Sequence, residues 1–290
     1  MDFLLNITAS GLVLGAMYGL IAMAFSVIYK TTGVVNFAQG EMMMLTAYIA
    51  WSLGVTLALP FWLMLPLVCV IAALIGALVE YAIIRPMMGE PPFAIIMATM
   101  GLAIAIRSLT ILIWGVNAEG FDASVKGGLF EIGPVVLFSE QIFALAVFLL
   151  VSVGIWAFMR FTRVGTAMRA TALDESAALL MGINVRRIHS LAWAISSIIA
   201  ALAGVCFALA FSRSPSMWFL GLQSFPASIL GGLDAPLGSA LGGLLVGVSA
   251  NLSEGYIGQG LKEISGFVII ILVLMIRPYG LFGRRDLERV

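Results

Sequence analysis

The length of the apolar runs is the feature that most constrains how this chain folds. Five runs are comparable to the roughly 20 apolar residues that a helix needs to cross a hydrocarbon core of about 30 Å. They are Phe3–Tyr29, Phe61–Ile84, Phe93–Trp114, Ile142–Met159 and Leu191–Phe211. Phe37–Val55 and Phe267–Ile276 are shorter or more polar, and both can extend into their flanks. We therefore predict an all-α fold: a polytopic helical bundle embedded in a membrane.

The composition agrees with a lipid environment. Of the 290 residues, 62% are hydrophobic and 10% are charged, whereas a soluble domain carries roughly a quarter charged residues. Too little polar surface remains to cover a water-soluble globule, so we expect residues 1–290 to form a single transmembrane domain. The formal net charge is zero, which gives no indication of a nucleic-acid surface.

The distribution of basic residues predicts which loops face the cytoplasm, because cytoplasmic loops carry the excess of lysine and arginine. The loop at about 160–190 contains Arg160, Arg163, Arg169, Arg186 and Arg187. The C-terminal tail contains Arg277, Arg284, Arg285 and Arg289. The loop at about 115–141 contains Lys126 against Glu119, Asp122, Glu131 and Glu140. We therefore place the first two segments in the cytoplasm and the third outside.

Counting spans back through Arg85 and Lys30, both expected inside, places the N-terminus outside. The N-terminal run has no basic region before it and no A-x-A cleavage site, so we expect it to be retained as a membrane helix. An N-terminus outside and a C-terminus in the cytoplasm require an odd number of membrane crossings. Seven and nine both satisfy this condition.

The last apolar region, Phe219–Leu252, is interrupted in its middle. The interruption contains Gly231, Gly232, Asp234 and Pro236. Irregular backbone is tolerated at membrane depth only where protein or a water-filled cavity surrounds it. The pattern predicts a broken helix or a re-entrant pair. Whether this region crosses twice or dips and returns decides between nine crossings and seven.

Small residues recur four positions apart along several runs. They are Gly11, Gly15 and Gly19, then Gly238 with Gly242, and Gly243 with Gly247. In lipid there is little hydrophobic drive between helices, so small residues that allow close backbone approach supply the contact energy. These faces are predicted to pack helices together; the alternative is that they slide during a transport cycle.

The sequence lacks the motifs of several catalytic and nucleotide-binding sites. It contains no G-x-x-x-x-G-K-[ST], no G-x-S-x-G and no H-E-x-x-H. His189 is the single histidine, and Cys69 and Cys206 both lie within apolar runs. We expect no metal site, no bound cofactor and no enzyme activity in this chain. If it moves a solute uphill, a partner must supply the energy.

Polar side chains stand at the start of the second apolar run, in the sequence N-F-A-Q-G-E of residues 36–41. One interpretation is that Asn36 caps a helix that starts near Phe37, with Glu41 in the opening turns, where the helix dipole favours negative charge. The alternative places the helix start in a translocation path. Asn36, Gln39 and Glu41 would then be path residues.

Arg107 lies in the middle of an apolar run, where an unpaired arginine costs at least a few kcal/mol. It is predicted to face the bundle interior or to reach toward the outer surface. Glu41 and Glu80 are both candidate partners. The two interpretations of Arg107 are a structural ion pair and a contact with a substrate carboxylate in the path.

The basic loop contains a segment with strong helix propensity. Residues 167–181 are rich in helix formers, and Gly182 stands where the helix would stop. At three- and four-residue spacing, one face of this helix would carry Ala170, Leu173, Ala177 and Leu180. A short amphipathic helix of this kind suits the groove of another protein. A position on the lipid headgroups is the alternative.

Together these features resemble the permeases of ABC importers for branched-chain amino acids. The resemblance rests on the glycine-rich opening at 11–22, the N-F-A-[HQ]-G-E signature at 36–41, the coupling loop at 165–184 and the motif A-S-I-L-G-G-L-D at 227–234. In the coupling loop it singles out Gly165, Arg169, Ala172, Asp174, Ala177 and Gly182. The length is similar to that of the shorter of the two permeases in such systems.

The resemblance implies a multi-subunit importer in a bacterial inner membrane. Its parts would be this chain, a second homologous permease, two cytoplasmic ATPases that bind ATP and magnesium, and a periplasmic binding protein. The family also carries urea, short amides and other small solutes. An autonomous channel or secondary carrier is the alternative, because discontinuous helices also form solute sites in such carriers.

Overall fold

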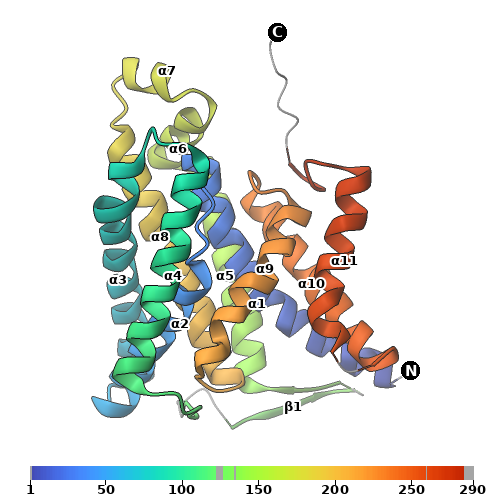
Figure 1. Cartoon of the computed structure of the whole chain (residues 1–290). Helices are drawn as coiled ribbons and strands as arrows, with labels where there is room; N and C mark the ends of the chain where they lie inside the picture. Colours follow the sequence, from blue (N-terminus) through green and yellow to red (C-terminus); the bar gives the residue numbers. More distant parts are fainter. Residues whose placement is uncertain (1, 122–126, 134, 259, 284–290) are drawn as a thin grey trace.

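The computed structural model describes residues 2–121, 127–133, 135–258 and 260–283. Within them the chain is a helical bundle with one short β-hairpin (Figure 1). The loop residues Asp122 and Lys126 and the tail residues Arg284, Arg285 and Arg289 lie outside the described residues. The predicted helical membrane bundle is confirmed.

Six of the described helical segments are long and apolar enough to cross a membrane. They are α1 (Asp2–Thr32), α3 (Phe61–Val79) with the turns that continue it to Met87, α4 (Pro92–Trp114), α5 (Ser139–Phe161), α8 (Val185–Ala210) and α10 (Pro236–Tyr256). Each of the five long apolar runs is therefore a helix. The continuation of α3 consists of a π-helical turn, η2 (Glu80–Ile84), and a 3-10 turn, η3 (Arg85–Met87).

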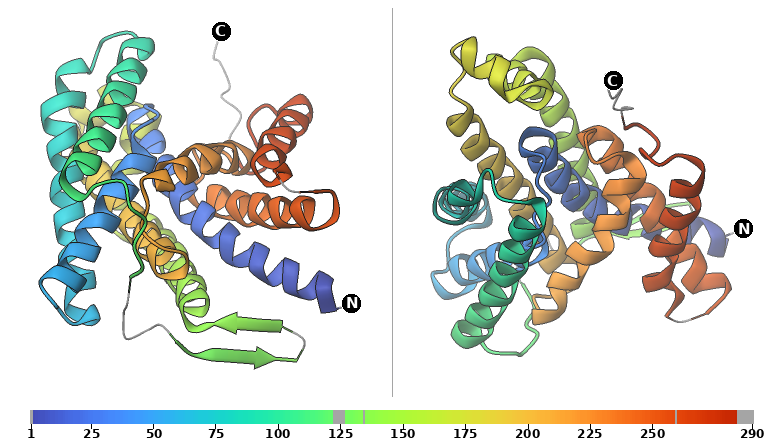
Figure 2. Two further views of the ribbon diagram at one scale, coloured as in Figure 1. Left: turned by 60° about the horizontal axis from the view of Figure 1, so that its bottom comes forward. Right: turned by 45° about the horizontal axis from the view of Figure 1, so that its top comes forward.

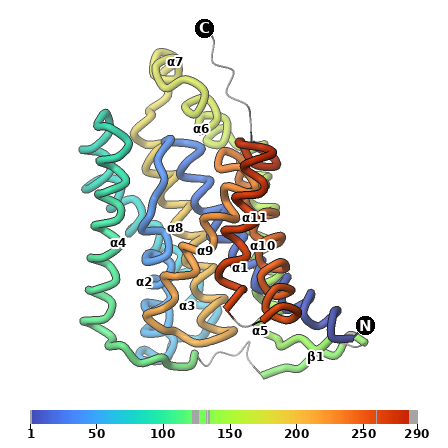
Figure 3. Tube along the Cα trace, turned by 45° about the vertical axis from the view of Figure 1, so that its right-hand side comes forward, coloured from blue at the N-terminus to red at the C-terminus, as the bar shows by residue number. Residues whose placement is uncertain are grey.

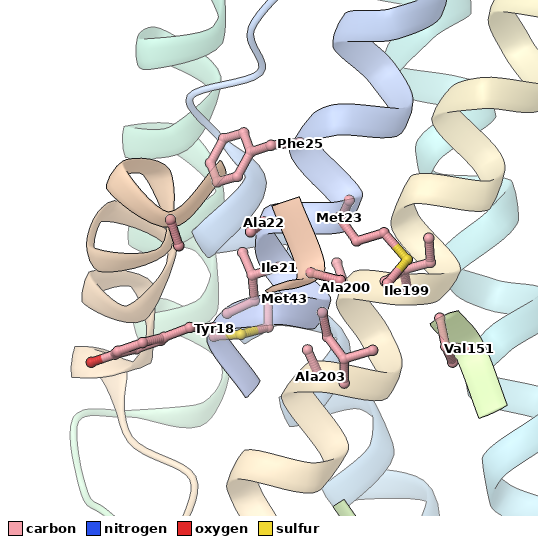
Figure 4. Close-up of a cluster of buried hydrophobic side chains, with 14 of the residues drawn as sticks. Tyr18, Ile21, Ala22, Met23, Phe25, Met43, Val151, Ile199, Ala200 and Ala203 are labelled. Atoms are coloured by element: carbon pink, nitrogen blue, oxygen red, sulfur yellow. The ribbon is translucent and has the colours of Figure 1, made fainter. Parts of the chain in front are cut away.

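The central helix of the bundle is α1. Of its most apolar 18-residue window, 94% is buried inside the protein, whereas the value for α3, α4 and α5 is 28%. Ile21 and Met23 of α1 pack with Met43 of α2 (Gln39–Trp51) and with Ile199 and Ala203 of α8 (Figure 4). Helices α3, α4 and α5 thus leave most of their apolar surface to lipid, while α1 is enclosed by protein.

Glycines join α1 to α10 in antiparallel contact. A Cβ atom at Gly243 would lie 2.2 Å from the Cα of Gly19, and one at Gly247 would lie 2.2 Å from the Cα of Gly15. These distances leave no room for a side chain. The predicted packing role of the four-residue glycine spacing is therefore confirmed, and α1 and α10 are the pair that Gly15, Gly19, Gly243 and Gly247 join.

The predicted break in the last apolar region is also present. Helix α9 (Trp218–Gly231) ends and α10 begins at Pro236, and the two lie antiparallel, with Gly231 against Gly238 and Ala227 against Gly242. Helix α11 (Leu261–Ile276) follows and packs beside both (Figure 2). The region therefore forms a helical hairpin.

Successive helices of the bundle alternate in direction (Figure 1, Figure 3). The alternating series is α1, α2, α3, α4, α5, α8, α9, α10 and α11. With 13, 14 and 16 residues, α2, α9 and α11 are shorter than a full span. The choice between seven and nine crossings therefore stays a prediction.

The predicted start of α2 was wrong by two residues. The helix begins at Gln39, with Ala38 at its N-cap position and without a side-chain cap. Asn36 instead accepts a hydrogen bond from the backbone N–H of Ala38 at 3.0 Å, which forms a turn just before the helix. At its other end α2 continues into a π-helical turn, η1 (Ser52–Thr56).

The loop at 115–141 contains a β-hairpin that the sequence analysis did not predict. Strands β1 (Leu129–Ile132) and β2 (Val135–Phe138) pair antiparallel, and α5 starts directly afterwards at Ser139. The hairpin lies at the end of the bundle opposite to α6 and α7 (Figure 3).

The single helix predicted over residues 167–181 is two helices. Thr162 accepts a hydrogen bond from Gly165 N at the start of α6 (Arg163–Leu173), and Asp174 accepts one from Ala177 N at the start of α7 (Glu175–Leu180). Asp174 is extended, with φ −159° and ψ 107°, so the helix is interrupted there. The common face proposed for Ala170, Leu173, Ala177 and Leu180 therefore does not exist. The predicted stop is present, since Gly182 has φ +79°.

Candidate functional site

Glu41 and Arg107 form an ion pair inside the bundle. Glu41 lies in the first turn of α2 and is 3% exposed, and Arg107 lies in the middle of α4. The Nη2 of Arg107 donates to Oε1 of Glu41. Of the two candidate partners that the sequence offered for Arg107, the structure selects Glu41. The pair offsets the cost of about 2.5–3.5 kcal/mol that a lone arginine carries at mid-membrane on insertion scales.

Trp218 completes the environment of Arg107. The guanidinium carbon lies 3.6 Å from the centroid of its ring, which is a cation–π contact. A glycine contact sets this geometry: a Cβ at Gly40 would lie 2.4 Å from the backbone oxygen of Trp218 and 3.0 Å from Gly221 Cα. Only glycine at position 40 lets α2 approach α9 closely enough to bring Glu41, Arg107 and Trp218 together.

A cavity of about 170 Å³ lies beside this ion pair. Its charged wall is Glu41 and Arg107, and the rest is mainly apolar. The large apolar lining residues are Phe25, Phe37, Met100, Ile104, Leu222 and Phe225. Since Met100, Ile104 and Leu222 are exposed, the cavity opens on the bundle surface between α4 and α9. The arrangement suits a small molecule that carries both charges and an apolar group.

Asn36 and Gln39 are buried next to this site but do not line the cavity. Asn36 donates to Oε1 of Gln39 at 2.9 Å, and Gln39 donates to Oγ of Ser196 at 3.1 Å. Ser196 in turn donates to the backbone oxygen of Ala24 at 2.8 Å. This chain of hydrogen bonds connects the start of α2 to α8 and α1. Of the four path candidates, the cavity therefore contains Glu41 and Arg107.

Glu80, the other candidate partner of Arg107, pairs with Arg85. Nη2 and Nε of Arg85 lie 2.8 Å and 3.2 Å from the two oxygens of Glu80, which is fully buried. Ser190 of α8 donates to the same carboxylate at 2.5 Å. A spacing of five residues does not place two side chains on one face of a regular α-helix, and the π-helical turn η2 between Glu80 and Arg85 brings them together.

A second buried arginine, which the sequence analysis missed, lies at the end of the bundle near the β-hairpin. Arg213 is 1% exposed, and its Nη2 lies 2.8 Å from Oε2 of Glu119, with which it forms an ion pair. Its guanidinium carbon lies 3.8 Å from the ring centroid of Trp51 and 4.7 Å from that of Tyr48. The backbones of Arg213 and Glu119 exchange two hydrogen bonds. This cluster fastens the loop after α4 to the segment after α8 and to the end of α2.

The helix break lies at the same end of the bundle as α6 and α7 (Figure 3). Gly232 has φ +104°, and a Cβ there would lie 2.5 Å from Gly283 N. Lys30, at the end of α1, donates to the backbone oxygen of Asp234 at 2.9 Å, and Pro236 begins α10. The break residues thus hold the turn against α1 and the C-terminal segment.

The coupling-loop residues lie in or around α6 and α7. Gly165 packs on α5, where a Cβ would be 2.4 Å from Phe158 O. Ala172, Asp174 and Ala177 are exposed, and Arg169 is half-buried. The four large apolar residues of this tip are also exposed: Leu173, Leu179, Leu180 and Met181. We call these four residues the tip patch. An apolar patch of this kind outside the spanning helices is typical of a protein contact.

Comparison with known proteins identifies the family. The sequence matches the family described as "Branched-chain amino acid transport system / permease component" over residues 7–277. The permease protein LivH of the Escherichia coli K12 high-affinity branched-chain amino acid transport system is 30% identical over 97% of this chain and 96% of its own length. The chain belongs to this permease family. BraD of Pseudomonas aeruginosa, described in the same terms, is also 30% identical with the same coverage.

A solved structure supports the same assignment at the level of the fold. The complex of PsaBC from Streptococcus pneumoniae with a Fab contains a chain that aligns with a TM-score of 0.52 at 15% identity. The alignment covers 93% of this permease and 91% of that chain. The family resemblance inferred from the sequence motifs is confirmed, and the protein is a multi-pass membrane permease component of a transport system.

Proposed function

We propose that this permease is the membrane-spanning subunit of an ATP-driven importer and that its solutes are branched-chain amino acids. The observation that carries the proposal is the cavity, in which the opposite charges of Glu41 and Arg107 stand beside an apolar wall. A free branched-chain amino acid carries an ammonium group, a carboxylate and an aliphatic side chain. Each of these groups has a chemical match in the cavity.

Passage of such a solute would proceed by exchange of charge partners. The carboxylate of the amino acid would accept hydrogen bonds from Arg107, and its ammonium group would donate to Glu41. The aliphatic side chain would lie against residues such as Phe25 and Phe225. Because each buried charge keeps an opposite charge, the internal ion pair opens without leaving an unpaired ion, the outcome that is costly in a membrane.

The tip patch is the proposed contact with the motor. This chain contains no nucleotide-binding motif, so the energy of transport must reach it through another subunit. Leu180 and Met181 are 88% and 83% exposed on α7 and just after it, next to the arginines of the loop. By the excess of basic residues, this end faces the cytoplasm and the N-terminus lies outside. An ATPase there would receive α6 and α7 in a groove.

The remaining partners follow from the proposed assembly. A second homologous permease would cover the open side of the cavity between α4 and α9, and two ATPases would dock on the paired tips. A periplasmic binding protein would deliver the solute to the end with the β-hairpin. The membrane is then the bacterial inner membrane.

Transport by the reconstituted complex tests this function. Vesicles that hold the complete set of subunits are expected to accumulate labelled leucine only when ATP is present on the side of the tip patch. Vesicles that hold this chain alone are expected to show no leucine flux. Flux through the chain alone would identify an autonomous carrier and refute the proposal.

A single charge introduced into the tip patch is expected to weaken the binding of the ATPase to the permease. Leu180→Asp places a carboxylate where apolar contact is proposed, and we expect at least about a tenfold loss of co-purifying ATPase, since central contact residues contribute 2 kcal/mol or more. The exposed position predicts a change in stability within about 0.5 kcal/mol. Val116→Asp, at an exposed apolar residue of the opposite end, is the control. Equal ATPase recovery from both variants would contradict the docking role.

A further inference from the structure

A basic cavity lies where α3 and α8 meet, at the same end of the bundle as α6 and α7. It has a volume of about 470 Å³ and its charged lining consists of Arg85, Arg186 and Arg187. Asn184, Ser190 and Leu191 complete the wall. Arg186 and Arg187 are exposed, and neither forms an ion pair with another described residue. The transport function proposed above does not use this cavity.

Of the three arginines that line the cavity, Arg85 is held in place by its contacts. Arg85 binds both oxygens of Glu80 through Nε and Nη2, and its Nη2 also donates to Oγ of Ser190 at 2.9 Å. The Glu80 carboxylate is fully buried and is shared between Arg85 and Ser190. These contacts fix the direction of the guanidinium and leave its Nη1 without a partner among the residues that the structure describes.

The surface changes from charged to apolar within one helical turn below the cavity, on both helices. On α8, Leu191 follows Arg187 by four residues and is exposed. On α3 and its continuation, Tyr81 precedes Arg85 by four residues, and the guanidinium carbon lies 4.9 Å from its ring centroid. Leu78 and Leu74 continue this face and are each more than 60% exposed. Residues four apart lie on one helix face, so the apolar column stands directly under the arginines.

We propose that this cavity binds the headgroup of an anionic phospholipid, whose acyl chains lie along the apolar column. Arginine forks match phosphate oxygens in paired hydrogen bonds, and basic pockets between membrane helices at the membrane boundary bind anionic headgroups. The three arginines supply the charge for the phosphate. The exposed column of Leu74, Leu78 and Tyr81 supplies the apolar contact that a free phosphate ion does not need.

A double substitution tests the site and leaves the buried ion pair intact. Arg186→Gln/Arg187→Gln removes two of the three positive charges and keeps Arg85. Loss of Arg85 would leave the buried Glu80 carboxylate without its ion-pair partner. The matched control is Arg160→Gln/Arg163→Gln, which removes two arginines from the same end of the protein but outside this cavity. Each variant is purified with its partner subunits, and monodispersity is measured first.

Binding is measured by native mass spectrometry during titration with phosphatidylglycerol, phosphatidylcholine or inorganic phosphate. The native complex and the control are expected to prefer phosphatidylglycerol, and the Arg186→Gln/Arg187→Gln variant is expected to bind it about tenfold more weakly or worse. Unchanged phosphatidylglycerol binding in that variant would overturn the proposal. So would inorganic phosphate that competes as well as the lipid, since the site would then be a free-anion site. Loss of the ATPase with unchanged lipid binding would identify these arginines as part of a protein contact instead.

Discussion

Replacing Gly243 with valine is expected to prevent the accumulation of folded permease. A Cβ at this position would lie 2.2 Å from both Cα and N of Gly19, so the side chain would meet backbone and not a flexible group. The substitution therefore forces α10 away from α1. Overpacking a core costs about 1–3 kcal/mol or more, and the contact lies on α1, which protein surrounds almost completely. Folded yield and melting temperature, measured by fluorescence-detected size exclusion in detergent, are expected to fall sharply.

The same substitution at an open glycine is the control. Gly154 lies in α5, is exposed, and has no atom within 4 Å of the position of an added Cβ. Gly154→Val carries the same propensity cost of a β-branched residue without the contact. A similar yield for both variants would mean that the distance between α1 and α10 does not determine folding.

The spans and the break were predictable because they depend on local features. The lengths of the apolar runs determine which segments form spanning helices. Glycine and proline residues determine the turn between α9 and α10. The four-residue glycine spacing predicted close packing but not its partner, because Gly19 and Gly243 are far apart in sequence. The division of α6 from α7 did not follow from helix propensity, because the preference of aspartate for N-caps outweighs that propensity at Asp174. Asp174 at an N-cap and Thr162 before α6 were the available signals.

Of the candidate site, the sequence predicted only the two charged residues, whose burial in a membrane costs free energy. Arg107 and Glu41 stood out because charges in a membrane require a partner, but the choice between Glu41 and Glu80 depends on how α2, α3 and α4 pack. The contact of Trp218 with Arg107 depends on the approach of Gly40 to Gly221, which no local pattern encodes. Long-range packing thus converts individual polar residues into a site.

Neutralising one member of the Glu41–Arg107 pair is expected to reduce leucine uptake about 10- to 100-fold. Hydrogen bonds to charged groups contribute about 1.5–3 kcal/mol, which corresponds to that range. Glu41→Gln leaves the guanidinium without its anion, and Arg107→Gln leaves a buried carboxylate alone. Breaking a buried pair destabilises by about 3–5 kcal/mol. Because the Arg107 side chain is 30% exposed, we expect the loss of stability to lie at the lower end of that range. Uptake and melting temperature are measured on the same preparations.

The double variant Glu41→Gln/Arg107→Gln separates a structural pair from a pair that contacts solute. It removes both charges together, so no unpaired ion remains and the melting temperature is expected to return close to that of the native protein. If the pair served only the fold, leucine uptake would recover with it. Because the proposed exchange needs Arg107 for the carboxylate and Glu41 for the ammonium group, uptake is expected to stay at the level of the single variants. A stable double variant with restored uptake would remove the pair from the translocation path.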